Sequence, residues 1–192
     1  EYVELSSFDE YCDTMRTFLR NPIPAQLKQA TKSEEPLHRQ LLGKLVAMPT
    51  LTADFSANHK ALHFIENFLT KRGMHVKQFE SNGFRSIVAT TRPGNKRPKV
   101  MLTAHTDVVP AAKEQFTLTS KGDKLFGRGV MDMKIAISSY LWLTDTLQDE
   151  LDQYDFGIMI TSDEEVGGRS GVGMLVNELG YHPEVAVIPD GG

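Results

Sequence analysis

Residues 100–110, with the sequence VMLTAHTDVVP, place a histidine and an aspartate directly after an apolar run that predicts a β-strand. His105 and Asp107 are the two ends of a His-x-Asp triplet. In an extended strand, residues two apart point to the same face, so the carboxylate can lie beside the imidazole. A metal-bound histidine usually donates its second ring N–H to a carboxylate or a carbonyl. The triplet therefore indicates a metal site, although a polar loop after a strand has the same pattern.

Carboxylates recur at the ends of two further predicted strands. Asp163, Glu164 and Glu165 follow the apolar segment GIMITS, and Asp190 follows VAVIP. In open α/β sheets, ligands bind outside the carboxyl ends of the strands. We therefore expect these side chains to converge near His105.

Another carboxylate, Asp132, lies in GRGVMDMK at the predicted start of a helix. Its alternative role is a helix N-cap, and the two glycines before it also fit a simple turn. One imidazole and several carboxylates at a single edge suit a hard or borderline divalent metal. Zinc accepts nitrogen and oxygen ligands, and a carboxylate can bridge two ions about 3.5 to 4 Å apart. The alternative for the acidic residues is a solvated surface patch.

The remaining histidines have weaker patterns. His59 and His63 lie four apart on a predicted helix that begins at Ser56 as its N-cap and ends at Gly73. The glutamate of a His-Glu-x-x-His motif is missing between them, so we expect solvated or packing roles. His182 precedes the last predicted strand, and we expect it in a loop.

The predicted elements indicate how these side chains are positioned. Two strands, 74–80 and 84–91, form an antiparallel pair, and the central strand starts at Lys99. Further predicted elements are helices 37–48, 133–147 and 170–179, strands 155–161 and 185–189, and a hairpin over 116–129 that turns at 121–123. Strands that alternate with helices predict an α/β fold, with a largely parallel mixed sheet covered by helices on both faces.

Residues 1–35 are expected to form an N-terminal extension, with residues 36–192 as the main domain. The extension contains an amphipathic stretch, FDEYCDTMRTFLR, followed by NPIPAQ and the polar TKSEEP. The chain begins at Glu1 rather than at a methionine, so we expect a processed or excised piece.

Composition excludes several classes of function. The 192 residues include 21 basic and 25 acidic side chains, a net charge of −4, and no long basic cluster, so nucleic acid is not an expected partner. No apolar run reaches the roughly 18 residues of a membrane span, and we expect a soluble protein without a membrane partner. Cys12 is the only cysteine, which excludes an intrachain disulfide and is compatible with a reducing compartment, so we expect a cytoplasmic location.

Four segments in this order, HTDVVP, GRGVMDMK, TSDEEVGG and PDGG, resemble a known family of co-catalytic metallohydrolases. The family includes aminoacylases, acetylornithine deacetylase, succinyl-diaminopimelate desuccinylase, glutamate carboxypeptidases and carnosinase-like dipeptidases. The resemblance covers about residues 37–192 and implies that residues 36–192 are the N-terminal portion of a metallohydrolase catalytic domain. It implies a zinc-exopeptidase-like fold and hydrolysis of an amide or peptide bond in a small acyl-amino acid or peptide.

The resemblance also implies a metal centre with two zinc ions, for which cobalt or manganese are alternatives. His105 and Asp190 would hold one ion, Glu165 would belong to the other, and Asp132 would bridge them. A cis peptide bond between Asp132 and Met133 is expected on the same basis.

Two catalytic roles follow from the same resemblance. Asp107 would orient the imidazole, and Glu164 would be the general base. Both ions would activate a shared water, so a carboxylate suffices to take its proton. Hydrolysis would then proceed without a covalent acyl-enzyme.

The sequence departs from the family in two places. The segment AAKEQFTLTS keeps only Phe116 where relatives usually have a tryptophan and a Pro-Phe pair. Relatives also continue beyond the position of Gly192 with a lid domain, through which the parent would form a homodimer, and with a C-terminal segment that supplies a metal-binding histidine. We expect the isolated chain to be a poor catalyst with at most one tightly bound zinc. A non-catalytic metal-binding or interaction module is the alternative hypothesis.

Overall fold

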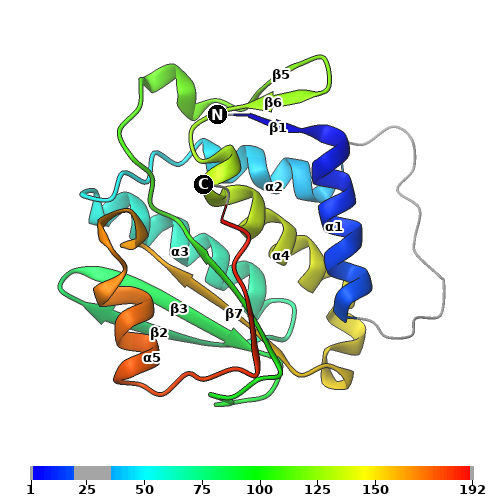
Figure 1. The fold of residues 1–192 in the computed structure, drawn as a ribbon, viewed down its shortest axis with the longest axis vertical. Helices are drawn as coiled ribbons and strands as arrows, with labels where there is room; N and C mark the ends of the chain where they lie inside the picture. The colour runs from blue at the N-terminus through cyan, green and yellow to red at the C-terminus, as the bar shows by residue number, and fades with distance from the viewer. Residues whose placement is uncertain (1, 20–35, 191–192) are drawn as a thin grey trace.

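The computed structural model describes residues 2–19 and 36–190 and has a mixed α/β fold built on a five-stranded sheet (Figure 1). The strands in spatial order are β2 (His75–Ser81), β3 (Phe84–Thr90), β7 (Phe156–Thr161), β4 (Val100–His105) and β8 (Val185–Val187). Strand β3 pairs antiparallel with β2 and β7, whereas β4 pairs parallel with β7 and β8. The predicted antiparallel pair is confirmed, and the parallel strands lie together on one side of the sheet.

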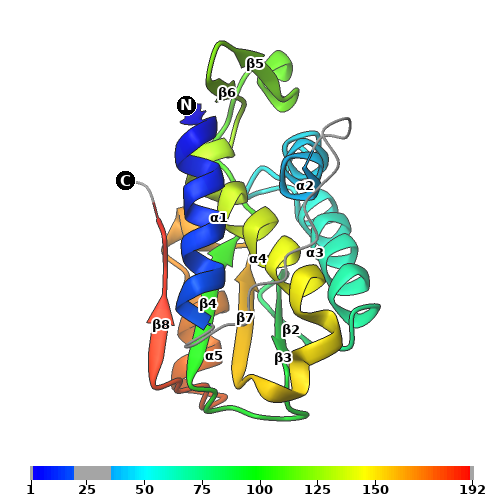
Figure 2. The same ribbon diagram turned by 90° about the vertical axis from the view of Figure 1, so that its right-hand side faces the viewer.

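Helices cover both faces of this sheet, as predicted (Figure 2). Helices α2 (Leu37–Val46), α3 (Phe55–Thr70) and α4 (Ile135–Leu147) lie on one face, and the short α5 (Met174–Asn177) lies on the other. Successive side chains of β4 point to opposite faces of the sheet. Leu102 and Ala104 pack in the larger core, and Met101 packs in the core on the other face, which includes Leu175. Because both of its faces are buried, β4 is an almost continuous apolar run.

Helix α3 begins one residue after Asp54, whose carboxylate accepts a hydrogen bond of 2.9 Å from the Ala57 N–H. The prediction that Ser56 caps this helix is wrong, because Ser56 lies inside the first turn and Asp54 satisfies the free amide instead. Leu62 and Leu69, seven residues apart on one side of the helix, are completely buried.

Three other helices are shorter than predicted, and one of them, α4, begins at Ile135 rather than at residue 133. Helix α2 ends at Val46, and the predicted helix 170–179 is a π-helical turn, Arg169–Gly173, that continues into α5. Gly180, with a positive φ of 74°, takes the chain away from this segment. Within residues 2–19 and 36–190, no helix has the length and apolar character required to cross a membrane.

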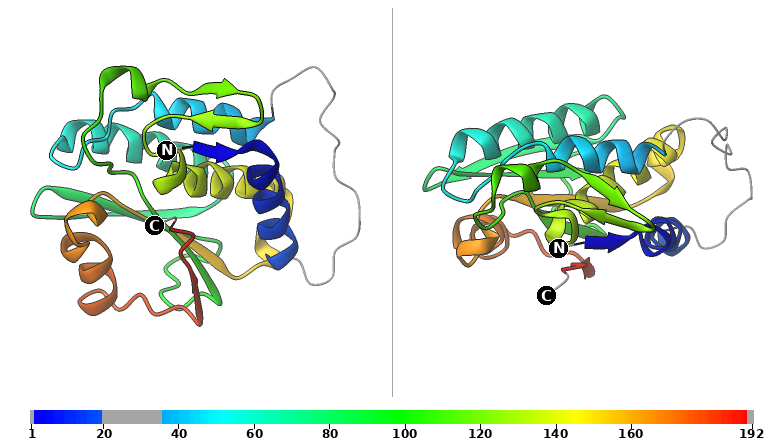
Figure 3. Two further views of the ribbon diagram at one scale, coloured as in Figure 1. Left: turned by 45° about the horizontal axis from the view of Figure 1, so that its top comes forward. Right: turned by 90° about the horizontal axis from the view of Figure 1, so that it is seen from above.

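A second sheet contains β1 (Tyr2–Glu4), β6 (Lys124–Phe126) and β5 (Thr119–Lys121), and Figure 3 shows it beside the start of α4. Strands β5 and β6 are the predicted hairpin. Helix α1 (Leu5–Leu19) follows β1 and packs on α4, with Phe8 and Cys12 buried in a core shared with α2. The start of the expected extension, which includes Phe8 and Cys12, therefore packs into the fold. The rest of the expected extension, 20–35, lies outside the described residues, and the domain boundary after residue 35 stays a prediction.

Candidate metal centre

Sequence-distant polar residues meet at the edge of the sheet where β4, β7 and β8 end. His105 is the last residue of β4 and is in register with Thr161, the last residue of β7. The turn η4 (Glu164–Val166) follows β7, and Asp190 follows β8. One ligand atom each from His105, Glu164 and Asp190 lies within 4.8 Å of the other two. This convergence follows from parallel pairing, which puts the carboxyl ends of the strands at one edge.

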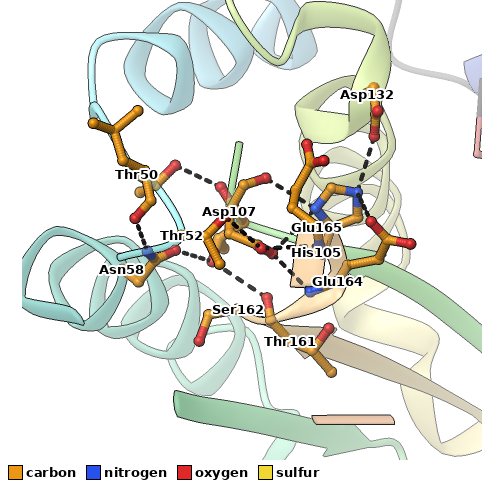
Figure 4. Close-up of polar contacts among 12 residues, drawn as sticks. Thr50, Thr52, Asn58, His105, Asp107, Asp132, Thr161, Ser162, Glu164 and Glu165 are labelled. Atoms are coloured by element: carbon orange, nitrogen blue, oxygen red, sulfur yellow. Dashed lines mark hydrogen bonds and ion pairs between the residues drawn. The ribbon is translucent and has the colours of Figure 1, made fainter. Parts of the chain in front are cut away.

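The imidazole of His105 is buried and contacts carboxylates on both sides (Figure 4). Its Nδ1 lies 2.9 Å from the carbonyl oxygen of Asp107 and 3.2 Å from the Asp107 carboxylate. Its Nε2 lies 2.9 Å from Oδ1 of Asp132 and 3.7 Å from Oε2 of Glu164. With Nδ1–H donated to Asp107, Nε2 is the ring nitrogen that faces the cluster and could bind a metal.

Asp132 reaches His105 from the turn η2 (Val130–Lys134), immediately before α4. Its backbone is not helical, with φ −121° and ψ 95°, and the first turn of α4 has no side-chain cap, so the N-cap alternative for Asp132 is wrong. The peptide bond between Asp132 and Met133 is cis, as the resemblance implied. Gly129, with φ +75°, begins this turn at a point where a Cβ would lie 2.8 Å from Val108.

Lys134 connects the same turn to the end of α2 through hydrogen bonds. Its side chain is 1% exposed, and Nζ donates hydrogen bonds of 3.0 Å to the Leu45 carbonyl and 2.8 Å to the Met48 carbonyl. Burial lowers the pKa of Lys134 to about 7. Sequence analysis did not identify this residue, because a lysine two positions after an aspartate carries no signal that it is buried.

Asp107 is completely buried, and its carboxylate does more than contact the imidazole. Oδ1 accepts a 3.2 Å hydrogen bond from the Glu164 N–H, and Oδ2 accepts one of 3.2 Å from the Glu165 N–H. Oδ2 also accepts a 3.1 Å hydrogen bond from the hydroxyl of Thr52, which sequence analysis did not identify. Asp107 therefore connects the end of β4 to the Glu164–Val166 turn.

Glu164 and Glu165 both project from this turn toward the cluster, and Figure 4 shows Glu165 near the imidazole. Burial raises the pKa of both carboxyl groups, and for Glu165 the negative charge of Asp132 raises it further. Among the described residues, the group of possible ligand atoms around His105 contains Glu164 rather than Glu165. The division of labour between the two glutamates thus rests on the resemblance and stays a prediction.

Asp163, the third acidic residue of this segment, has a local structural role. Its carboxylate accepts hydrogen bonds of 2.7 Å from the Ser170 N–H and 2.9 Å from the Gly171 N–H. A Cβ at Gly171 would overlap this carboxylate and would lie 2.8 Å from Cβ of Thr161. Asp163 therefore stabilises the loop that leads from Glu164 to Gly171.

The other histidines lie away from the centre. His59 contacts the Gly83 carbonyl at 3.2 Å, and the exposed His63 contacts Asn67 at 2.9 Å, in agreement with the packing and solvated roles expected. His182 lies in the loop before β8, at the opposite end of that strand from Asp190.

A cavity of about 540 Å³ opens beside the cluster. Its lining includes His105, Glu164 and Asp190 together with Arg169 and the apolar side chains of Met133, Val172 and Ile188. This volume lies in the range of about 300 to 1,000 Å³ that is usual for small-molecule sites. The cluster is therefore accessible to a small molecule.

The surrounding carboxylates change the protonation of His105. Burial lowers its pKa, but the hydrogen bond to Asp107 and the charges of Asp107, Asp132 and Glu164 outweigh burial and raise the pKa to about 9. In the metal-free protein the imidazole is therefore charged at neutral pH. A metal that binds Nε2 must displace this proton.

We expect zinc affinity to increase with pH up to about 9, by about tenfold per pH unit for one displaced proton. Titration calorimetry of the metal-free full-length protein, in buffers with different ionisation enthalpies, measures both the affinity and the protons released. An affinity that is independent of pH, without proton release, would contradict the placement of His105 in the metal site.

Comparison with known proteins finds similarity to one family over the segment that contains most of these motifs. Residues 101–191 match the model described as Peptidase family M20/M25/M40. Succinyl-diaminopimelate desuccinylase of Orientia tsutsugamushi (strain Ikeda) is 34% identical over 163 residues, which are 78% of this chain and 41% of that protein. The enzyme of the same name from Variovorax paradoxus (strain S110) is 30% identical over 162 residues, 76% of this chain and 40% of that protein. The chain spans about two fifths of the length of these relatives.

Solved structures agree on the fold. Human carnosine dipeptidase 1 has a TM-score of 0.67 at 17% identity, over 97% of this chain and 41% of that one. An M20 family metallo-carboxypeptidase from Sulfolobus solfataricus has a TM-score of 0.64 at 17% identity, over 81% of this chain and 37% of that one. The chain thus resembles the M20 metallopeptidases in motifs and in fold, and the predicted zinc-exopeptidase-like architecture is confirmed.

Proposed function

We propose that this chain carries most of the two-zinc centre of an enzyme that hydrolyses an amide or peptide bond in an N-acyl amino acid or a peptide. The observation that carries the proposal is the convergence of His105 with Asp132, Glu164 and Asp190 beside an open cavity. The relatives are named as desuccinylases, and the structural neighbours as a dipeptidase and a carboxypeptidase. These names support hydrolysis and do not favour a non-catalytic module.

The donor set fits the proposed ions. An imidazole nitrogen and carboxylate oxygens are accepted by zinc, and cobalt or manganese are alternatives. His105 and Asp190 would hold one ion and Glu165 the other, with Asp132 shared between them. When bound, such ions lower the pKa of a water and polarise the scissile carbonyl.

The protein itself would supply the proton transfer. Glu164, whose pKa is raised by burial, would take a proton from the attacking water and deliver it to the departing amine. Asp107 would keep Nδ1–H of His105 engaged so that Nε2 stays directed at the cluster. Because water attacks directly, no acyl-enzyme forms.

Hydrolysis of a panel of N-succinyl amino acids, N-acetyl amino acids and dipeptides by the full-length protein tests this proposal. We expect turnover of at least one class, loss of turnover after chelation, and its return when zinc is added. Turnover that persists at negligible metal content would contradict it.

Arg169 gives a prediction about substrate charge. It is the only lysine or arginine among the described residues that line the cavity, and guanidinium groups bind carboxylates in a bidentate manner. We expect Arg169→Gln to raise KM about tenfold for substrates with a free carboxylate, and to have little effect on the matching carboxamides. Steady-state kinetics would compare it with Arg97→Gln, which alters an exposed arginine outside the cavity lining. Equal effects on both substrate types would contradict a contact with the carboxylate.

Two broader expectations remain predictions. Light scattering of the full-length protein tests whether it forms a homodimer through a lid domain. The cytoplasmic location inferred from a single cysteine is tested by fractionation of the source cells.

A further inference from the structure

The loop between α2 and α3 holds the chain on both sides of Asp107. The Thr50 hydroxyl donates to the Thr106 carbonyl, and the Val108 N–H donates to the Thr50 carbonyl at 2.9 Å. The Thr106 hydroxyl donates to Oδ1 of Asn58, at the start of α3, at 2.8 Å. All of these side chains are almost completely buried. These hydrogen bonds hold the backbone on both sides of Asp107 to the loop and to α3, and Figure 4 shows Thr50, Thr52 and Asn58 beside Asp107.

The same loop supplies one donor to the Asp107 carboxylate, the Thr52 hydroxyl. The other donors that contact this carboxylate are the imidazole of His105 and the N–H groups of Glu164 and Glu165. Among the described residues, Thr52 is thus the one donor that lies outside the proposed metal centre. Asp107 is completely buried, so the loss of one of these donors weakens the set of hydrogen bonds that holds its carboxylate.

We propose that Thr52 is a positioning residue of the metal centre. Its hydroxyl fixes the orientation of the Asp107 carboxylate. That carboxylate in turn holds the Glu164–Glu165 peptide against the imidazole of His105. The hydroxyl of Thr52 donates to Asp107, and Thr52 is not among the residues that line the cavity, so we expect it to act through Asp107. The inference rests on the proposed function for its catalytic consequence, whereas the hydrogen-bond linkage can be tested without catalysis.

The test compares Thr52→Val, which keeps the shape and removes the donor, with Thr52→Ser, which keeps the donor, in the full-length protein. We expect Thr52→Val to lower kcat and zinc affinity about 10- to 100-fold with little change in KM. We expect Thr52→Ser to retain most of the kcat and zinc affinity of the natural protein. In the metal-free protein, amide hydrogen exchange should become faster at Glu164 and Glu165 in Thr52→Val only. Exchange at Leu62 in α3 should not change.

The inference is overturned if Thr52→Val matches the natural protein in kcat, zinc affinity and exchange. It is equally overturned if exchange accelerates throughout α3 and Thr52→Ser fails to restore kcat, because the role would then be general stability. Failure of the proposed function has a different signature, since the natural protein would then show no metal-dependent hydrolysis. The exchange at Glu164 and Glu165 would still decide whether Thr52 holds their peptide.

Discussion

Replacement of Glu164 by glutamine should lower kcat by about 10² to 10⁴-fold in the full-length protein and leave its zinc content nearly unchanged. Glutamine keeps the size and polarity of the side chain but cannot accept the proton of the attacking water. Glu164 is partly exposed at the cavity wall, so the change should not disturb the core. Steady-state kinetics and metal analysis on the same sample measure both effects.

Glu165→Gln is the matched variant, since it makes the same change one residue later in the same turn. We expect it to lose zinc together with activity, because Glu165 is the proposed ligand. Glu164, rather than Glu165, belongs to the group of possible ligand atoms around His105, so this comparison decides which glutamate binds the metal. If Glu164→Gln lost zinc and Glu165→Gln kept it, the two roles would have to be exchanged.

Asp132→Ala should reduce activity to the level of the chelated protein and remove most of the bound zinc. Asp132 is the carboxylate proposed to be shared by both ions, and it already contacts Nε2 of His105 at 2.9 Å. Its side chain is 33% exposed, so alanine should leave no buried cavity and the fold should persist. Metal analysis, kinetics and circular dichroism separate loss of metal from loss of structure.

Asp123→Ala is the control for this variant, because Asp123 is an exposed aspartate in the hairpin turn between β5 and β6. It should keep zinc content and activity. An Asp132→Ala protein that held two zinc ions per chain and kept ordinary turnover would show that Asp132 does not bridge them.

The sequence was sufficient to predict the elements that have clear strand periodicity or clear turn residues. Strand β4, the hairpin β5–β6 and the antiparallel pair β2–β3 all appear where periodicity and turn residues predicted them. The rule that ligands bind at strand ends then predicted that His105 and Asp190 would meet. The positions of the strands and the meeting of His105 with Asp190 were both predictable, because pairing within the sheet fixes where each strand ends.

Local competition between neighbouring residues limited the prediction of helix ends. Asp54 and Ser56 both have N-cap side chains, and only the backbone geometry selects Asp54. The helix predicted over 170–179 is replaced in part by the Arg169–Gly173 turn, because Gly171 must approach the Asp163 carboxylate closely. Propensity alone does not contain this tertiary contact.

Contacts between distant residues were outside the reach of sequence patterns. The hydrogen bond from Thr52 to Asp107 joins positions 55 residues apart, and Lys134 contacts carbonyl groups more than 80 residues earlier in the chain. Neither threonine nor lysine has a spacing signal at these positions. The relation of Glu164 and Glu165 to the imidazole also depends on the geometry of a short turn, which no periodicity describes.

Anomalous X-ray diffraction from zinc-loaded crystals of the full-length protein tests the central claim most directly, because it locates the ions relative to named atoms. We expect two zinc peaks about 3.5 to 4 Å apart with the Asp132 carboxylate between them. Nε2 of His105 and the Asp190 carboxylate should bind one ion, and Glu165 should bind the other. A zinc-loaded protein without a peak at ligand distance from both His105 and Asp132, or with its ions bound at His59 and His63 instead, would contradict the account.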